Sequence, residues 1–269
     1  MVYNGVIFWS DIMLENPAFN EKNEKILCEM GGKNASMLMN IKVKRLFAGE
    51  SFSLCDEKNE TAFLLLKGKV SFTYGGESVE TDFRESPFVK TPYALHVCRN
   101  TAVKVEAIKD SEIIIQQTDN EREFAPVYYT PEKCLYQEFG QTQWEGTGKR
   151  TCATMFDLSN APYSNMVLGE VFHNPGRWSS YPPHHHPQPE VYYYQFDYPQ
   201  GFGAAFMGDD VQKCTDGSFL CIEPHNAHQQ VCAPGYTMYY VWMIRHIDGD
   251  PWDKTRIYEK EHEWLANAD

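Results

Sequence analysis

A glutamate and a histidine recur in both halves of this 269-residue chain at almost the same separation, and this repeat constrains the fold more than any other feature. In the second half, Glu190 opens a strand-like run, and His228, the last residue of a Pro-His-Asn-Ala-His pentad, follows 38 residues later. In the first half, His96 ends a Pro-Tyr-Ala-Leu-His pentad 36 residues after Glu60. A matched glutamate at a matched distance is typical of a duplicated unit. We therefore predict two copies of one domain.

Short runs of β-branched and aromatic residues, broken by Gly, Pro, Asn and Asp, fill both halves. Aromatic residues make up 14% of the chain, which favours β structure. Regularly spaced short strands with turn signals indicate a sandwich or barrel. The expected strands are Lys42–Phe47, Thr61–Leu66, Lys69–Tyr74, Ala102–Ile108, Glu112–Gln116, Met166–Phe172, Glu190–Phe196, Gly203–Met207, Phe219–Ile222 and Tyr236–Ile244.

Few helices are expected, with candidates only at Asn34–Met39 and Tyr258–Leu265. The pair Gly75-Gly76 indicates a hairpin turn. The fold class is therefore all-β: two antiparallel β-barrels in tandem, spanning residues 1–125 and 126–269. The polar stretch Thr118–Pro131 is expected to connect them.

The charge of the chain disfavours two classes of partner. It carries 24 Lys and Arg against 37 Asp and Glu, a net charge of −13. Nucleic acids and anionic membranes need a basic surface, so neither is expected to bind. The beginning of the sequence does not resemble a signal peptide, and the longest apolar stretch, Tyr236–Ile244, is too short to span a membrane. The eight cysteines form no C-x-x-C pair, so we expect reduced thiols in a cytoplasmic protein.

Three consecutive histidines precede Glu190, and they carry the strongest chemical signal. On an extended segment, His184 and His186 project from one face while His185 points away. After a Pro-Gln-Pro turn, Glu190 can return a carboxylate to the same point, and His228 can supply a fourth ligand from the opposite edge of the barrel. Three imidazoles and one carboxylate suit one divalent metal ion, Mn²⁺, Fe²⁺, Zn²⁺, Co²⁺ or Ni²⁺. The alternative interpretation is an exposed histidine-rich loop.

The first half keeps the glutamate and the histidine but not the paired histidines. At the positions that match His184 and His186, it has Leu54 and Asp56. We therefore expect no metal site there, and a packing or pairing role for His96.

A His-x-His pair, a glutamate after a short gap and a distant histidine resemble the metal signature of cupins, which are small antiparallel β-barrels. Two copies make a bicupin. The similarity narrows to the family of 5-deoxy-glucuronate isomerases of bacterial myo-inositol breakdown, which is related to the ketol-isomerases of pectin-derived uronates. It is dense from about residue 146 to 264 and looser before that. The gap after the histidines is shorter than these isomerases often have. The runs that carry the resemblance are Asn174-Pro-Gly-Arg-Trp-Ser-Ser-Tyr-Pro-Pro-His-His-His186, Pro189-Glu-Val-Tyr-Tyr-Tyr-Gln-Phe196, Tyr198-Pro-Gln-Gly-Phe202, Ala233-Pro-Gly-Tyr-Thr-Met-Tyr-Tyr-Val-Trp242, Leu46-Phe-Ala-Gly-Glu-Ser51 and Leu64-Leu-Leu-Lys-Gly-Lys69.

The resemblance implies an aldose–ketose isomerisation of 5-deoxy-D-glucuronate to 2-deoxy-5-keto-D-gluconate, in which a metal polarises the carbonyl and a base moves a proton between adjacent carbons. Alternation from Glu190 puts Tyr192 and Tyr194 on the ligand face, where they either border the pocket or form barrel core. Tyr194 and His173 are the candidates for the catalytic proton carrier.

A sugar-acid substrate also needs a cation in an acidic protein, and arginine matches a carboxylate best. The candidates are Arg150, Arg177 and Arg245, with Arg150 preferred because it resembles a family position in Gly-Lys-Arg-Thr. Since bicupins often pair, a homo-oligomer is also an expectation.

Two other functions fit the same ligand set. One is another metal-cupin enzyme, such as an iron dioxygenase or a related uronate ketol-isomerase. The other is a non-catalytic sugar-binding bicupin. Similarity outside the ligands favours the isomerase, and turnover without oxygen would exclude a dioxygenase.

Overall fold

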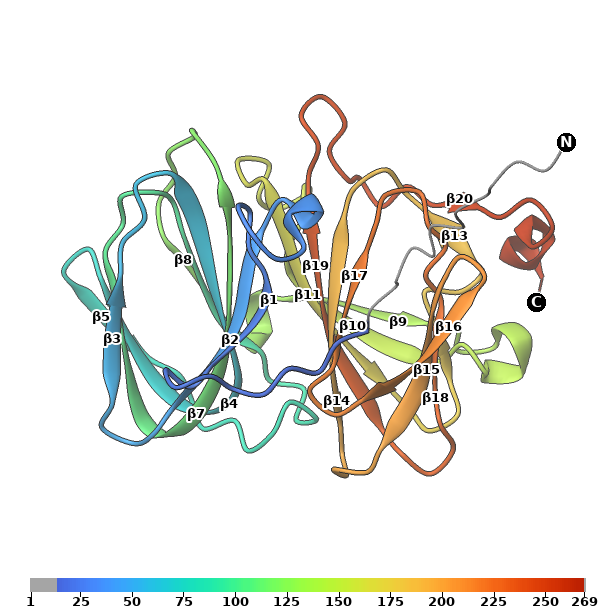
Figure 1. The fold of residues 1–269 in the computed structure, drawn as a ribbon, viewed down its shortest axis with the longest axis horizontal. Coiled ribbons are helices and arrows are strands. Elements are labelled where there is room, and N and C mark those ends of the chain that lie inside the picture. Colours follow the sequence, from blue (N-terminus) through green and yellow to red (C-terminus); the bar gives the residue numbers. More distant parts are fainter. Residues whose placement is uncertain (1–13, 269) are drawn as a thin grey trace, which may run out of the picture.

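The computed structural model describes residues 14–268, which fold into two β-barrels lying side by side (Figure 1). Every pairing between the strands of this region is antiparallel. The all-β fold of two tandem antiparallel barrels is thus confirmed. The eight cysteines are all free, and no helix in the described region is long and apolar enough to cross a membrane.

The first barrel is one eight-stranded sheet. Its order is β1-β2-β7-β4-β6-β8, with β3 paired to β7 and β5 to β4. The expected hairpin is confirmed: Gly75 and Gly76, both with positive φ, join β4 to β5. The strands are β1 (Glu24–Cys28), β2 (Asn40–Leu46), β3 (Ser51–Leu54), β4 (Asn59–Tyr74), β5 (Glu77–Glu80), β6 (Tyr93–Val97), β7 (Val103–Asp119) and β8 (Val127–Tyr129).

The last of these strands bears on where the first barrel ends. Strand β8 pairs with β6, although its residues follow position 125. We therefore propose that the boundary between the two barrels lies a few residues later than expected, after Tyr129.

The second barrel combines a six-stranded sheet, a four-stranded sheet and a two-stranded pair. The six-stranded order is β17-β14-β19-β11-β10-β9, the four-stranded order is β12-β18-β15-β16, and β13 pairs with β20. The strands are β9 (Leu135–Phe139), β10 (Arg150–Phe156), β11 (Met166–His173), β12 (Trp178–Ser179), β13 (His184–His185), β14 (Glu190–Phe196), β15 (Phe202–Met207), β16 (Asp210–Thr215), β17 (Phe219–Ile222), β18 (Gln230–Cys232), β19 (Met238–Arg245) and β20 (Ile257–Tyr258).

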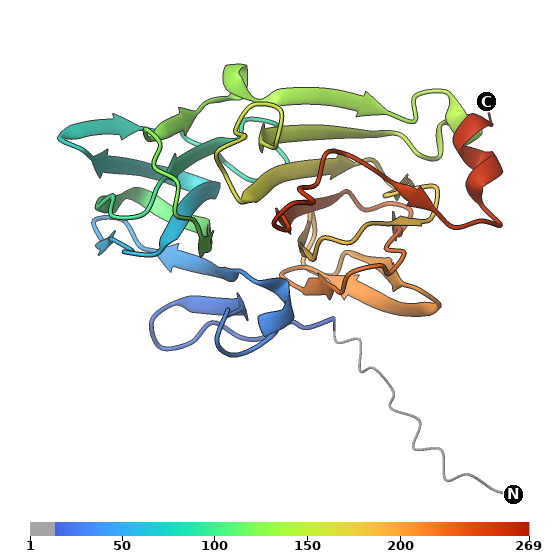
Figure 2. The ribbon, with the colours of Figure 1, turned by 90° about the horizontal axis from the view of Figure 1, so that it is seen from above.

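The expectation of few helices is confirmed: within residues 14–268, helical structure consists of the short 3₁₀ turns η1 (Ala35–Met37), η2 (Pro131–Lys133), η3 (Gln143–Gly146) and η4 (Glu263–Asn267), of which η2 and η3 were not expected. The expected helix at 34–39 contains η1. The one expected at 258–265 begins in β20 and reaches η4, which lies at the far end of the second barrel (Figure 2).

Apolar side chains form three cores: one inside each barrel and a larger one between them. Strands β10, β11, β14 and β19 are buried along their whole length, because one face lines the second barrel and the other packs on the first. Strand β14 shows the alternation: Tyr192 and Tyr194 belong to the inner core, whereas Val191 and Tyr193 belong to the shared one. Two-sided burial explains why these strands have continuous apolar runs.

Buried polar contacts also join the barrels, among them those of Glu170 and Glu60. The Arg84 guanidinium lies 2.7 Å from the Glu170 carboxylate, both side chains are fully buried, and the Tyr239 hydroxyl donates to the same carboxylate at 2.5 Å. In the first barrel, Glu60 binds the Nε2 of His96 at 2.7 Å and accepts the backbone N–H of Asn165 at 2.6 Å. The repeated glutamate and histidine of the first half therefore pair with each other and hold the segment that leads into β11.

Candidate active site

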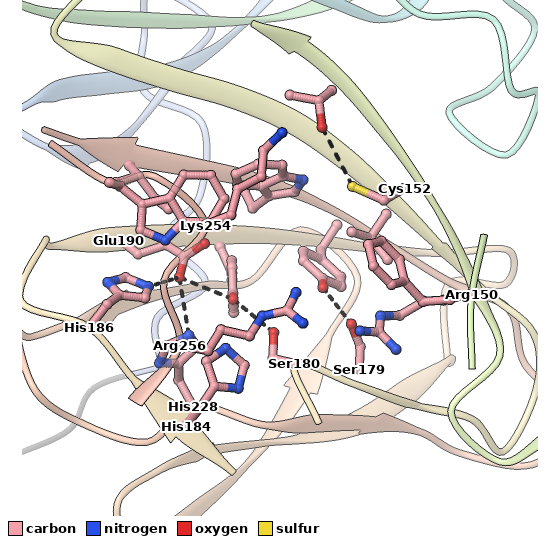
Figure 3. A pocket seen from close by; sticks show the side chains of 18 of the residues that line it. Arg150, Cys152, Ser179, Ser180, His184, His186, Glu190, His228, Lys254 and Arg256 are labelled. Carbon is pink, nitrogen blue, oxygen red and sulfur yellow. Dashed lines mark hydrogen bonds and ion pairs between the residues drawn. The ribbon is translucent and has the colours of Figure 1, made fainter. Parts of the chain in front are cut away.

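Four side chains converge on a cavity of about 200 Å³ inside the second barrel (Figure 3). His184 lies on β13, His186 follows it, Glu190 opens β14 and His228 precedes β18. The Oε2 of Glu190 lies 3.3 Å from the Nε2 of His186 and 3.3 Å from that of His228. The ring of His184 joins this group, with its centroid 5.1 Å from that of His228. The structure therefore brings ligand atoms of His186, Glu190 and His228 within 4.8 Å of one another, and it places the ring of the fourth predicted ligand, His184, beside that of His228.

The three imidazoles are held in one orientation by the backbone. In each, Nδ1 lies 2.8–2.9 Å from the carbonyl oxygen of a residue two positions away, which leaves Nε2 free to face the cavity. Burial lowers the pKa of His228 to about 4 and also lowers the pKa of His184. Neutral rings with a fixed Nδ1–H are the form that binds metals. Together with the carboxylate, these residues fit a divalent metal ion.

The remaining histidine of the triplet has a different environment. His185 is half-buried and does not line the cavity, and its ring packs against His225 with centroids 5.7 Å apart. This placement agrees with the alternation of an extended segment.

Of the two tyrosines expected on the ligand face, one borders the cavity. The Tyr192 hydroxyl lies 3.2 Å from Glu190 Oε2 and 3.0 Å from Ser180 Oγ. The Tyr194 hydroxyl instead donates to the Gln230 side chain at 2.7 Å, and Tyr194 is not among the residues lining the cavity. Burial, followed by the charge of Glu190, raises the pKa of Tyr192 well above its ordinary value, so its hydroxyl stays protonated.

His173, the other candidate proton carrier, also lies outside the lining of the cavity. It ends β11, where its Nδ1 is 3.3 Å from the carbonyl oxygen of Arg177. Burial lowers the pKa of His173 to about 3. The imidazole of His173 therefore stays neutral, buried next to Arg177 and close to the charge of Arg150.

The three candidate arginines have different surroundings. Arg150 lines the cavity, is 6% exposed and donates to the Gly148 carbonyl, but it has no ion pair within residues 14–268. Arg245 faces the first barrel, where it binds Thr118 and lies 3.1 Å from Asp119. Arg177 does not line the cavity. Only the preferred candidate is therefore in a position to meet a ligand there.

Comparison with known proteins assigns the chain to a family. The sequence model of the KduI/IolB family matches residues 13–265. The chain belongs to the KduI/IolB family. The curated 5-deoxy-glucuronate isomerase of Bacillus subtilis subsp. natto is 25% identical over 275 residues, covering 94% of this chain and 98% of the relative. Full-length similarity to enzymes of this name makes this KduI/IolB-family chain an isomerase.

Solved structures show the same fold. An IolB-like protein from Salmonella typhimurium LT2 has a TM-score of 0.78 at 23% identity, covering 85% of this chain and 90% of that one. The oxalate decarboxylase of Lactobacillus farciminis, solved as a formate complex, has a TM-score of 0.64 at 12% identity, covering 97% and 89%. The expected bicupin fold is thereby confirmed for this KduI/IolB-family member.

The segment after the last barrel strand contributes pocket residues that were not expected from the sequence. Trp252, Lys254 and Arg256 all line the cavity. Lys254 forms an ion pair with Asp157 at 2.9 Å. No motif marks these positions, and their only signal is a run of charged and aromatic residues beyond β19.

Gly169 leaves room for the indole of Trp242 on the neighbouring strand. Trp242 lines the cavity from β19, directly opposite Gly169 on β11. A Cβ atom at position 169 would lie 2.2 Å from the Trp242 ring, so a side chain there would displace the indole. The missing side chain at Gly169 therefore lets the indole lie over the neighbouring strand, where it lines the pocket.

Proposed function

We propose that this isomerase converts 5-deoxy-D-glucuronate into 2-deoxy-5-keto-D-gluconate in myo-inositol breakdown, with a divalent metal held by His184, His186, Glu190 and His228. One observation carries the proposal: the convergent metal ligands and the buried, unpaired Arg150 share a single cavity. A sugar acid needs both, since its carbonyl end requires a Lewis acid and its other end a cation. The names of the curated relatives support the same substrate.

The bound metal would supply Lewis-acid polarisation of the carbonyl and of the neighbouring hydroxyl oxygen. Backbone carbonyls keep the ligand rings aimed at the cavity before any ion or substrate enters, so little reorganisation is needed on binding. Trp252 lies edge-on to His186, with ring centroids 6.4 Å apart, and packs against Trp242, so that two indoles form the apolar side of the cavity.

Arg150 holds the substrate carboxylate in this proposal. The guanidinium of Arg150 carries five N–H donors, and the Gly148 carbonyl oxygen accepts from only one of its nitrogens. A local cation of this kind resolves the conflict between an anionic substrate and a chain of net charge −13.

Tyr192 takes the role of proton carrier in place of Tyr194 and His173, because its hydroxyl faces the cavity beside Glu190. Isomerisation moves one proton between adjacent carbons and another between the oxygens they carry, and the role proposed for Tyr192 is the second of these transfers. A phenol that stays protonated can donate to the carbonyl oxygen while it accepts from the neighbouring hydroxyl, which transfers the oxygen-bound proton without net change.

We expect Tyr192→Phe to lower kcat by about 10²-fold, at the lower end of what general acid–base groups contribute, with metal content retained. Tyr194→Phe removes a hydroxyl that binds Gln230 away from the cavity, and its kcat should stay within about threefold of the wild type. Steady-state kinetics and metal analysis of both variants test this. A larger loss of kcat in Tyr194→Phe would reverse the assignment.

The reaction itself is tested by incubating metal-loaded protein with 5-deoxy-D-glucuronate under anaerobic conditions and following the product by NMR. We expect the 2-deoxy-5-keto product to form without oxygen, to disappear after treatment with a chelator, and to return with at least one of Mn²⁺, Fe²⁺, Zn²⁺, Co²⁺ and Ni²⁺. Absence of turnover with all five metals would contradict the proposal, and an oxygen requirement would favour a dioxygenase.

A further inference from the structure

Arg256 reaches the cavity from a segment that is anchored to the metal-binding strand. Strand β20 pairs with β13, with Ile257 opposite His185 and Tyr258 opposite His184. The backbone N–H of Glu259 adds a bond of 3.0 Å to the Pro183 carbonyl. Arg256 directly precedes β20, so these pairings fix the position from which its side chain extends.

Two guanidinium groups face the same cavity. In Figure 3, the Arg256 side chain extends from the side of His184 toward the side on which Arg150 lies. Both arginines lie over the ring of Phe139, with the guanidinium carbons 4.8 Å (Arg150) and 5.8 Å (Arg256) from its centroid. Both also line a second, smaller cavity, which shares Phe139, Arg150 and Arg256 with the first. They therefore mark the junction of the two cavities.

Neither of these cations has an acidic partner in the part of the chain that the structure describes. No carboxylate pairs with Arg150 or Arg256 within residues 14–268, whereas the third pocket cation, Lys254, is paired with Asp157 at 2.9 Å. Arg256 is half-buried, and the buried arginines Arg84 and Arg245 elsewhere in this region have acidic partners. Two like charges beside one aromatic ring repel each other, and an anion bound between them would offset that repulsion. The pair is thus built for an anionic ligand.

We propose that Arg256 completes a two-arginine clamp with Arg150, and that this clamp binds the substrate carboxylate and selects acids over neutral sugars. Arg256 is then a specificity-determining residue supplied by the segment after β19. The inference deepens the proposed function and rests on it for the identity of the acid. The metal ligands would bind the carbonyl end of the sugar, and the clamp its acidic end.

The test compares 5-deoxy-D-glucuronate with its neutral carboxamide in wild type and Arg256→Gln. We expect the substitution to lower kcat/KM for the acid by about 10–100-fold, the range of a lost charge-assisted hydrogen bond. The kcat/KM for the amide should stay within about threefold, so that the preference for the acid collapses. Arg256→Lys should restore part of it, since it keeps the charge but not the fork.

Lys260→Gln is the matched control, because it removes a positive charge from the same segment at an exposed position outside the cavity. It should leave the acid-to-amide ratio unchanged. Equal losses for acid and amide in Arg256→Gln would overturn the clamp, since they would indicate a structural role. An unchanged ratio would overturn it as well.

A binding measurement separates this inference from the proposed reaction. Metal-loaded proteins are titrated calorimetrically with D-gluconate and with neutral D-glucitol. We expect wild type to bind gluconate at least about tenfold more tightly than glucitol, and Arg256→Gln to lose that difference. If neither 5-deoxy-D-glucuronate nor its carboxamide is turned over, but wild type prefers gluconate and Arg256→Gln does not, the proposed reaction is wrong and the anion clamp stands. If turnover is normal and Arg256→Gln keeps the difference, the clamp is wrong and the reaction stands.

Discussion

His228→Ala is expected to be isolated without its metal and without isomerase activity. The Nε2 of His228 faces Glu190 Oε2 at 3.3 Å inside a closed ligand group, and alanine leaves one coordination position without a donor. Substitution of residues that merely orient metal ligands already weakens metal binding by about 10–100-fold, so loss of a ligand should exceed about 100-fold. His184→Ala should behave in the same way.

Metal content per chain, measured by mass spectrometry after dialysis, checks this expectation. His96→Ala is the matched control, because it removes the corresponding histidine of the first barrel. His96 binds Glu60 and stacks on Phe156 with ring centroids 4.2 Å apart, so its loss should cost stability while metal content is kept. Thermal denaturation reports the stability of each variant separately. Equal metal content in His228→Ala and His96→Ala would show that the metal is bound elsewhere.

Glu170→Ala should lower the free energy of unfolding by about 3–5 kcal/mol, the cost of leaving one buried charge unpaired. The carboxylate of Glu170 is fully buried between the barrels and binds Arg84 at 2.7 Å and the hydroxyl of Tyr239 at 2.5 Å. Its removal leaves the Arg84 guanidinium with backbone carbonyl partners only. Urea denaturation of the wild type and the variant measures the difference.

A double variant shows whether the stranded charge is the cause. Arg84→Met together with Glu170→Leu replaces both ions by apolar groups and should recover most of the lost stability, because pairs replaced together are often nearly neutral. Metal content should be normal in both variants, since neither residue lines the metal cavity. A double variant less stable than Glu170→Ala would mean that the ion pair itself is a net stabilising contact.

The residues proposed as metal ligands could be placed near one another from the sequence because their arrangement depends on local geometry. His184 and His186 share a face of an extended segment, and Glu190 opens the next strand after a short turn. The separation of Glu190 and His228 nearly equals that of Glu60 and His96, because both barrels follow the same chain path between these positions. These relations need no knowledge of distant contacts, which is why four residues spread over 45 positions could be assigned to one site.

The positions of the other proposed site residues, the tyrosines and the arginines, depend on tertiary structure instead. Tyr192 and Tyr194 share a face, and only their depth in the barrel decides which of them meets the cavity. Arg245 ends a strand near the site in sequence, yet Asp119 of the first barrel binds it. Arg256 enters the pocket only because β20 pairs with β13, and two-residue strands have no periodicity to detect.

The apolar core between the barrels restricts which substitutions the two halves of the sequence can accept during evolution. The first barrel has Leu54 and Asp56 where the second has the paired histidines, yet strands of the second barrel pack against its facing side. Sequence drift in the first half is therefore least constrained on its outer loops. Positions that touch β11, β14 and β19 are expected to co-vary with those strands across the family, so that the first barrel is inherited as a scaffold for the second.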